Sequence, residues 1–464
     1  MSLEGAIATN RFGLGARPGE IARASANPKA WLMGQMNGPA PQLVGADGKG
    51  FPNTGKLVSE AADYKIQRFM SAGDRKKGGK GEKVTMSVSE MEERKIMAGA
   101  PNIRREEYIA EMDARFTLGI TTDRPFAERV VRFWSNHFAI SAQKPKVLIF
   151  AGDFEREAIR PHINGNFEDM LFAAAMHPAM QIYLDNWHSI GPNSAQGKRH
   201  SKNINENLGR EMMELHTLGV DGGYTQADVI ALAKLLTGWG LFEGRPNGFG
   251  FYPERHEPGP IALRGKTYPA GWDGSAAAVK DLAHDPATAR NIARKLAAHF
   301  IADDPPKESV ARLERVFKDT GGNLHALNEA IVNEPAAWQP EQKKMRSPVE
   351  FVTAAMRATG TDHLTGDRRP AKNTKELLSA VRVMGEAPLA PTSPKGWPDN
   401  SDAWNGSDAM LARIQWARNF SADLPGRVSA KSVAEAGLGP FLRPTTQAAM
   451  AGASSQTEAV ALLL

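Results

Sequence analysis

The chain of 464 residues contains no cysteine. Disulfide bonds, thiolate metal ligands and cysteine nucleophiles are therefore all excluded. Reducing and oxidising compartments both hold proteins without cysteine, so this absence does not indicate where the protein works.

Long apolar runs are absent as well. No stretch approaches the roughly 18 residues that a membrane-spanning helix needs. Residues 1–19 lack a basic segment followed by an apolar core, which is the pattern of a signal peptide. We therefore expect a soluble protein, cytoplasmic by default, and periplasmic or exported if a leader is missing from this chain.

The common catalytic signatures are also missing. The sequence holds no Gly-x-Ser-x-Gly elbow, no P-loop, no His-Glu-x-x-His and no dinucleotide fingerprint after a strand. Any active site must therefore be argued from individual side chains.

Acidic residues are slightly fewer than basic ones, which gives a net charge of +5 and an isoelectric point of about 9.2. Part of the positive excess lies in the run Arg75–Lys83. A basic loop can contact nucleic acid or anionic lipid. Because no aromatic residues interleave with these lysines, stacking on bases is not supported, and we expect a solvated loop and no nucleic-acid partner.

The dominant pattern in the sequence is the helical periodicity of its apolar residues. Apolar residues recur at helical spacing from about Pro101 onward, and few segments alternate as strands do. We predict an all-α fold, formed by a single large multi-helix domain over residues 1–464 with little or no β-sheet. The predicted helices cover approximately 21–36, 102–118, 123–138, 152–163, 166–176, 178–185, 204–218, 226–237, 275–283, 286–301, 306–318, 324–332, 347–358, 373–384 and 407–419.

Three segments break this pattern. Residues 72–100 are rich in glycine and lysine and then polar, which predicts a flexible insertion. Residues 240–274 hold eight glycines, five prolines and six aromatic residues, which predicts a long ordered loop, with room for a hairpin. Residues 388–406 form a second such loop. Long loops in compact domains are often functional, so 240–274 and 388–406 are candidate functional loops.

The first candidate catalytic residue is Glu211. At ~100° per residue, the leucines and the isoleucine of the segment 204–218 lie within ~60° of it on one helix face. A carboxylate buried there must be paired, bound to a metal or protonated. Glu214, three residues on, could share a cation or a proton with it, whereas His216 points ~140° away by the same rotation.

The second candidate is His137, which shares an apolar stripe with Phe126, Val130, Phe133 and Trp134. Helices pack through their apolar stripes, so His137 and Glu211 are expected to meet. A histidine–carboxylate pair can perform acid–base catalysis or hold a metal ion. A hydrogen bond that only stabilises the core explains the same pattern equally well.

A further group of residues is predicted to bind a ligand. His256 and Lys266 lie in the glycine-rich loop, where histidines near acids and lysines suit ligand contact. Asn207 and Arg210 lie beside Glu211, and Trp239 directly precedes the loop. Exposed polar positions and a surface salt ladder from Glu206 to Glu214 are the alternative explanation.

Several long motifs resemble the bacterial domain-of-unknown-function family 1800, and together they span almost the whole chain from Arg11–Gly15 onward. They are 133–138, 205–219, 223–229, 236–239, 251–256, 346–350 and 395–405. The resemblance implies a predominantly helical protein without a settled activity. It also implies a partner, because genes of this family often neighbour a sulfatase-like family. The chain departs from the family in having His256-Glu257 where His-Asp is usual, and His216 where many members have phenylalanine, which weakens a ligand role for His216.

Two functions from different classes follow. The favoured one is an enzyme with an internal site of His137, Glu211 and Glu214 that performs acid–base or metal-assisted hydrolysis of an unknown substrate. One divalent metal ion is compatible with this site, and the cofactor stays open. The alternative is a non-catalytic accessory or binding protein that partners a sulfatase-like protein. A weaker third reading, sugar binding, requires exposed indole faces at Trp397 or Trp404.

Overall fold

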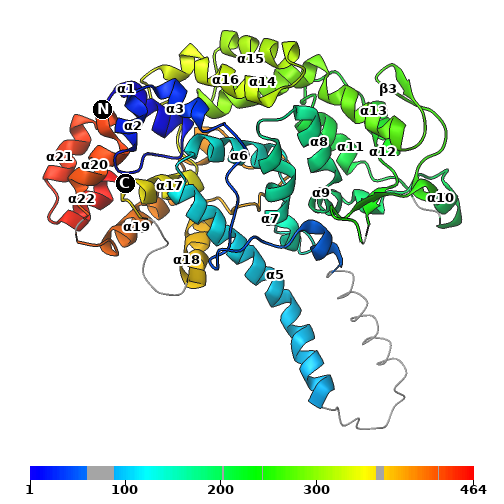
Figure 1. Ribbon diagram of the computed structural model, residues 1–464, viewed down its shortest axis with the longest axis horizontal. Coiled ribbons are helices and arrows are strands. Elements are labelled where there is room, and N and C mark those ends of the chain that lie inside the picture. Colours follow the sequence, from blue (N-terminus) through cyan, green and yellow to red (C-terminus); the bar gives the residue numbers. More distant parts are fainter. Residues whose placement is uncertain (60–87, 201–202, 243, 362–369, 427) are drawn as a thin grey trace.

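The computed structural model describes residues 1–59, 88–200, 203–242, 244–361, 370–426 and 428–464. Helices dominate these residues, and the two chain ends lie on the same side of the molecule (Figure 1). None of the described helices has the length and apolarity that crossing a bilayer requires.

The first part of the chain contains one long helix and several shorter helical pieces. Its elements are α1 (Leu3–Ile7), the π-helical turn η1 (Ala8–Phe12), α2 (Glu20–Ser25), α3 (Pro28–Gly34), α5 (Val88–Thr121), α6 (Pro125–His137), η2 (Leu148–Phe150), α7 (Ala151–Asp153), the π-helical η3 (Phe154–Ile159), η4 (Arg160–His162), α8 (Phe167–Met176) and α9 (Pro178–Tyr183). The N-terminal part of α5 extends away from the body of the molecule (Figure 1).

The middle of the chain carries the described strands. Its elements are η5 (Asn186–His188), α10 (Ala195–His200), α11 (Asn207–Glu211), the π-helical turn η6 (Met212–His216), α12 (Gln226–Leu235), β1 (Trp239–Leu241), β2 (Phe249–Phe251), η7 (Pro253–Arg255), β3 (Ile261–Leu263) and β4 (Lys266–Tyr268). The strands pair as two antiparallel hairpins, β1 with β2 and β3 with β4. The glycine-rich loop 240–274 therefore folds around two small hairpins.

The last part is helical again. Its elements are α13 (Trp272–Ala283), α14 (Pro286–Phe300), α15 (Lys307–Asp319), α16 (Leu324–Asn333), η8 (Pro335–Trp338), α17 (Pro348–Ala358), α18 (Pro370–Val383), η9 (Ser401–Ala403), α19 (Ser407–Ala422), α20 (Ala430–Gly437), η10 (Gly439–Phe441), α21 (Pro444–Ala451) and α22 (Gln456–Leu463). This content confirms the predicted all-α fold class.

Capping side chains explain several helix starts. Ser347 accepts a hydrogen bond from the backbone of Glu350, whose side chain binds back, so α17 begins with a capping box. Asn27 caps α3 ahead of Pro28, which divides the predicted helix 21–36 into α2 and α3.

Two expectations about segments need correction. Residues 72–87 of the predicted flexible insertion lie outside the described residues, and residues 88–100 belong to α5. The helices between Ala430 and Leu463 were not predicted, because short alanine-rich segments with few large apolar residues carry a weak periodic signal.

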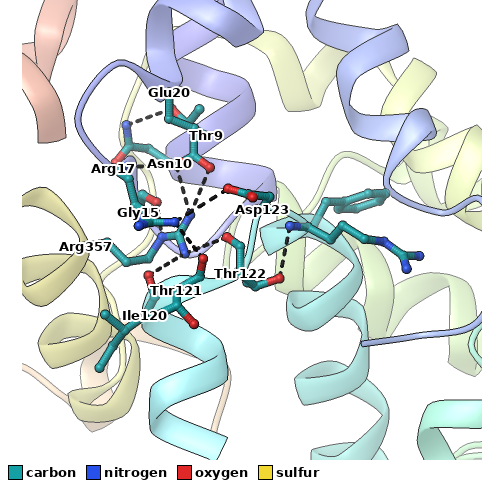
Figure 2. Close-up of polar contacts among 12 residues, drawn as sticks. Thr9, Asn10, Gly15, Arg17, Glu20, Ile120, Thr121, Thr122, Asp123 and Arg357 are labelled. Carbon is teal, nitrogen blue, oxygen red and sulfur yellow. Dashed lines mark hydrogen bonds and ion pairs between the residues drawn. The ribbon is translucent and has the colours of Figure 1, made fainter. Parts of the chain in front are cut away.

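A buried ion pair joins distant parts of the chain (Figure 2). Arg357 of α17 is fully buried, and its Nη2 lies 3.0 and 2.9 Å from the two carboxylate oxygens of Glu20. Its Nη1 donates to the carbonyl oxygens of Gly119, Ile120 and Thr122 at 3.0–3.1 Å. One guanidinium therefore holds α2 and the C-terminal end of α5 against α17.

A second buried charge network runs beneath α6. Arg160 donates to Glu128 at 2.7 and 2.8 Å and to Glu155 at 2.7 Å, and all three side chains are completely buried. Glu155 also accepts from Arg115 Nε at 2.8 Å and from the Ser135 hydroxyl at 3.0 Å. Buried charges are costly unless they are paired, and these contacts fix the positions of Arg115 and Ser135.

Candidate functional site

His137 lies at the end of α6 and is 2% exposed. Its Nε2 donates to the carbonyl oxygen of His216 at 3.1 Å, and its Nδ1 has no partner among the described residues. Burial, together with the charge of Lys295, lowers the pKa of His137 well below its usual value. The ring therefore stays neutral within the core.

The expected hydrogen bond between His137 and Glu211 does not form. Glu211 is only half-buried at the end of α11. Burial and the charge of Glu214 raise the pKa of the Glu211 carboxyl, and Arg210 opposes them. Glu214 is also half-buried and accepts a 3.5 Å hydrogen bond from the Tyr224 hydroxyl.

The hydrogen bond between His137 and Glu211 is missing because the helix type changes within residues 204–218. The prediction applied one rotation of ~100° per residue throughout 204–218. In the structure α11 ends at Glu211, and the π-helical turn η6 follows from Met212 to His216. A π-helix closes its hydrogen bonds at i→i+5 and turns less per residue. His216, which is 1% exposed, therefore reaches the face that packs against His137, with their ring centroids 6.3 Å apart.

His256 and Glu257, which are adjacent in the loop 240–274, hold this loop against neighbouring segments. His256 Nε2 accepts from the backbone N–H of Gly271 at 2.8 Å, so its Nδ1 donates to the Thr237 carbonyl at 2.8 Å. Glu257 accepts from the backbone and side chain of Asn193 at 3.0 and 2.6 Å. Both ring nitrogens of His256 are thus occupied by backbone groups.

The other predicted ligand-binding residues lie apart from one another. Asn207 is exposed at the start of α11, and Arg210 binds Glu206 and Gln226 at 3.0 and 2.9 Å. Lys266 pairs with Asp281 on the surface. Trp239 is 1% exposed and donates to Ser275 at 3.1 Å. The structure does not bring these side chains together at one site.

Metal coordination was part of the favoured prediction. Among the residues that the structure describes, no group of three or more histidine, aspartate and glutamate side chains is placed to hold a metal ion. The predicted His137, Glu211 and Glu214 do not form such a group.

A different site lies beside α6. A cavity of about 100 Å³ opens between α5, α6, α14, the segment 344–350 and the loop 386–404. Three runs of the family resemblance, 133–138, 346–350 and 395–405, contribute to its walls. Its ionisable lining residues are Arg115, Arg129, Arg132, His299, Lys344, Glu350, Glu386 and Asp399.

A histidine–aspartate pair forms one wall. His299 of α14 is 9% exposed, and its Nδ1 lies 2.9 Å from Oδ1 of Asp399. Burial acts to raise the pKa of Asp399, but the hydrogen bond and charge of His299 and the charge of Lys344 hold it below its usual value. The carboxylate can only accept, so in the neutral imidazole Nδ1 carries the proton and the lone pair is on Nε2. Nε2 is buried and has no partner among the described residues.

The same cavity holds a second carboxyl group, Glu386, whose pKa is shifted in the opposite direction to that of Asp399. Glu386 accepts from the backbone N–H of Val349 at 2.8 Å. Burial, which outweighs this hydrogen bond, raises the pKa of Glu386 above its usual value. A carboxyl group whose pKa is raised by burial favours its neutral form, which can donate a proton.

The loop that carries Asp399 is fixed to α6 by one amide. Asn136 Nδ2 donates to the Trp397 carbonyl, and its Oδ1 accepts from the Trp397 N–H, both at 2.8 Å. Trp404 is 3% exposed, so its indole anchors the loop and offers no open face to a sugar. Gly396 approaches so closely that an added Cβ would lie 2.5 Å from the Asn136 carbonyl oxygen.

Sequence reasoning missed this cavity almost entirely. The loop 388–406 was singled out, but not Asp399 within it. Arg129 and Arg132 lie three residues apart and so share one face of α6, but the sequence does not show that this face points inward. His299 carried no comparable signal, because its partner lies 100 residues away.

Comparison with known families covers nearly the whole chain. No curated protein and no solved structure matches it. A family model described as "Protein of unknown function (DUF1800)" matches residues 7–464, in agreement with the resemblance that the sequence motifs indicated. The chain therefore belongs to the DUF1800 family of proteins of unknown function.

Proposed function

We propose that the protein is a hydrolase that uses acid–base catalysis in the cavity around His299. The observation that carries the proposal is the His299–Asp399 pair at 2.9 Å, with the lone pair of Nε2 left without a partner in a cavity that also holds Glu386. This keeps the class of reaction predicted from the sequence and moves it from His137 and Glu211 to His299, Asp399 and Glu386.

The proposed step is the hydrolysis of an ester. Nε2 of His299 accepts a proton from water while the water oxygen bonds to the electrophilic centre. The bond from that centre to the ester oxygen breaks, and this oxygen takes the proton of Glu386 and leaves as the alcohol. Exchange with solvent then returns a proton to Glu386 and removes one from His299. Asp399 orients the imidazole and stabilises its positive charge.

The test is a panel of p-nitrophenyl esters of phosphate, sulfate and acetate. Wild-type protein is expected to release nitrophenol from at least one of them, and His299→Gln is expected to lower the rate about 100-fold or more. His284→Gln is the matched control, because His284 also pairs with a carboxylate, Glu168 at 2.8 Å, but lies outside the cavity. Release from none of the esters, or an unchanged rate in His299→Gln, would contradict the proposal.

A docking role is the second candidate. The resemblance implies a sulfatase-like partner, and α19 supports a protein contact by exposing Met410, Leu411 and Ile414 within one turn. Clustered exposed apolar side chains mark interaction surfaces more often than chance. Co-purification with the sulfatase-like protein tests this role, and Leu411→Glu with Ile414→Glu should abolish it while His299→Gln leaves it intact.

A further inference from the structure

Three arginines of the cavity have donors without acceptors. Arg115 donates from Nε to Glu155 at 2.8 Å and makes no other hydrogen bond within the described part of the chain. Nε of Arg129 and both Nε and Nη2 of Arg132 are buried, and they too lack a hydrogen-bond partner there. Buried donors in folded proteins are nearly always satisfied, so this cavity lacks an acceptor.

The carboxylates nearby do not supply it. Glu155 is shared between Arg115 and Arg160. Glu350 lies 3.3 Å from Arg129 Nη2 and also caps α17. The raised pKa of Glu386, caused by its burial, favours the neutral form of this carboxyl group.

The remaining cation, Lys344, is already satisfied. Its Nζ donates to Asp303 at 2.9 Å and to the carbonyl oxygens of Ala298 and Asp399 at 2.7 and 2.5 Å. It therefore supports the wall that carries Asp399, and the unmet demand for an anion rests on the three arginines.

Arg132 shows that demand most clearly. Its one hydrogen bond is a long one, 3.4 Å from Nη1 to the Thr353 hydroxyl, and no described carboxylate lies within ion-pair distance. Burial and the neighbouring charge of Arg115 lower the pKa of Arg132 to about 10, so it still carries its charge at neutral pH. An unpaired buried guanidinium is costly unless an anion joins it.

From these contacts we infer that the cavity binds a tetrahedral oxyanion, the phosphate or sulfate group of the substrate, between Arg115, Arg129 and Arg132. The inference rests on the proposed hydrolase function and names its substrate class. Guanidinium groups from α5 and α6 approach from different helices, which suits an anion with oxygens on several sides better than a planar carboxylate. The group would then lie in the same cavity as His299 and Glu386.

The experiment is calorimetric titration of the full chain with sodium phosphate, sodium sulfate and sodium acetate at constant ionic strength. Wild-type protein is expected to bind phosphate or sulfate and to bind acetate more weakly. Arg132→Gln should weaken binding about 10- to 100-fold, the loss of a hydrogen bond to a charged group. The matched control is Arg124→Gln, because Arg124 also has a buried Nη2 without a partner but lies outside the cavity.

Two further variants keep the test decisive if Arg132→Gln folds poorly. Arg132→Lys keeps the charge but loses the planar fork, and is expected to bind with intermediate affinity. Gly119→Ala keeps every charge and would place a Cβ 2.2 Å from Arg132 Nη2, which forces the guanidinium to move. Phosphate or sulfate binding that is absent in wild type, or equal in wild type and both Arg132 variants, would overturn the inference.

His299→Gln separates this inference from the proposed function. The variant should bind phosphate or sulfate as tightly as wild type while it fails to hydrolyse esters. Anion binding without any ester hydrolysis in wild type would contradict the proposed function and leave the anion site standing. Hydrolysis of p-nitrophenyl acetate alone, without binding of phosphate or sulfate, would support the proposed function and contradict the anion site.

Discussion

Nδ1 of His299 in α14 lies 2.9 Å from Oδ1 of Asp399 in the loop before α19, across 100 residues of sequence. This contact places an oriented imidazole at a cavity whose other walls carry three arginines and Glu386. The catalytic residues predicted from the sequence, His137, Glu211 and Glu214, do not line this cavity. The predictions below test the contact, the loop that supplies it and the fold around it.

The first prediction concerns the orientation of the imidazole. Asp399→Asn should lower kcat about 100-fold with the ester that wild type hydrolyses fastest, because the amide no longer fixes the protonated Nδ1. KM should change by less than about threefold, since Asp399 does not hold the substrate. Asp402→Asn, an exposed residue of the same loop, is the control. Equal kcat values for the two variants would exclude an orienting role for Asp399.

The second prediction concerns the contact that holds the loop 388–406 against α6. Gly396 has a φ of +80° and packs against Asn136. Gly396→Ala should destabilise the protein by about 1–3 kcal/mol, through a left-handed alanine and a steric clash, and should lower activity with it. Gly406→Ala is the control, because Gly406 has a φ of −60° and open space around its Cα. Denaturant unfolding measures the change, and identical midpoints for both variants would contradict it.

The third prediction concerns the ion pair of Figure 2. Arg357→Met and Glu20→Gln should each cost about 3–5 kcal/mol of unfolding free energy, because each leaves a buried charge without its partner. The double variant should cost less than the sum of both, with a coupling of at least about 1 kcal/mol. The exposed pair Lys318–Glu314 should give only about 0.3–0.5 kcal/mol in the same cycle.

Additive effects of Arg357→Met and Glu20→Gln would show that the pair is not coupled. In that case the six carbonyl and carboxylate contacts of Arg357 would act independently of one another.

The fourth prediction concerns acid stability. Burial lowers the pKa of His177 to about 3, and of His216 to about 3. The unfolded state binds protons at these histidines near pH 6.5, so the stability they contribute is present above pH 6.5 and is lost as the pH falls toward 3. The slope is about 1.4 kcal/mol per pH unit for each histidine.

His177→Asn isolates one of these groups. Asparagine can replace the cap that His177 Nδ1 provides to the Ala179 N–H, but it does not titrate. Between pH 6 and pH 4 the unfolding free energy of the variant should fall less steeply than that of wild type. Parallel slopes in urea titrations at these pH values would exclude His177 as a source of the acid sensitivity.

The sequence predicted the helices of this fold far better than its site. Apolar periodicity located α6 and α14 to within a few residues, because their large apolar side chains repeat at helical spacing. The same reasoning failed at η6, where a π-helical turn changes the rotation and moves His216 into the place expected for Glu211.

The cavity was hidden for a different reason. Arg129 and Arg132 count as polar in any periodic pattern, and a pattern does not tell which polar residues point inward. His299 and Asp399 are unremarkable by themselves, and only the packing of α14 against the loop 388–406 joins them. Contacts between distant segments are the part of a fold that local periodicity does not contain.

The contact between Glu20 and Arg357 also has a consequence for how the chain folds. The two residues are 337 positions apart. At ribosomal rates of about 5–20 residues per second, α2 is made roughly 20–70 seconds before its partner on α17 exists. During that time Glu20 lacks its guanidinium partner, so the native contacts of the N-terminal segment are completed only after most of the chain has been made.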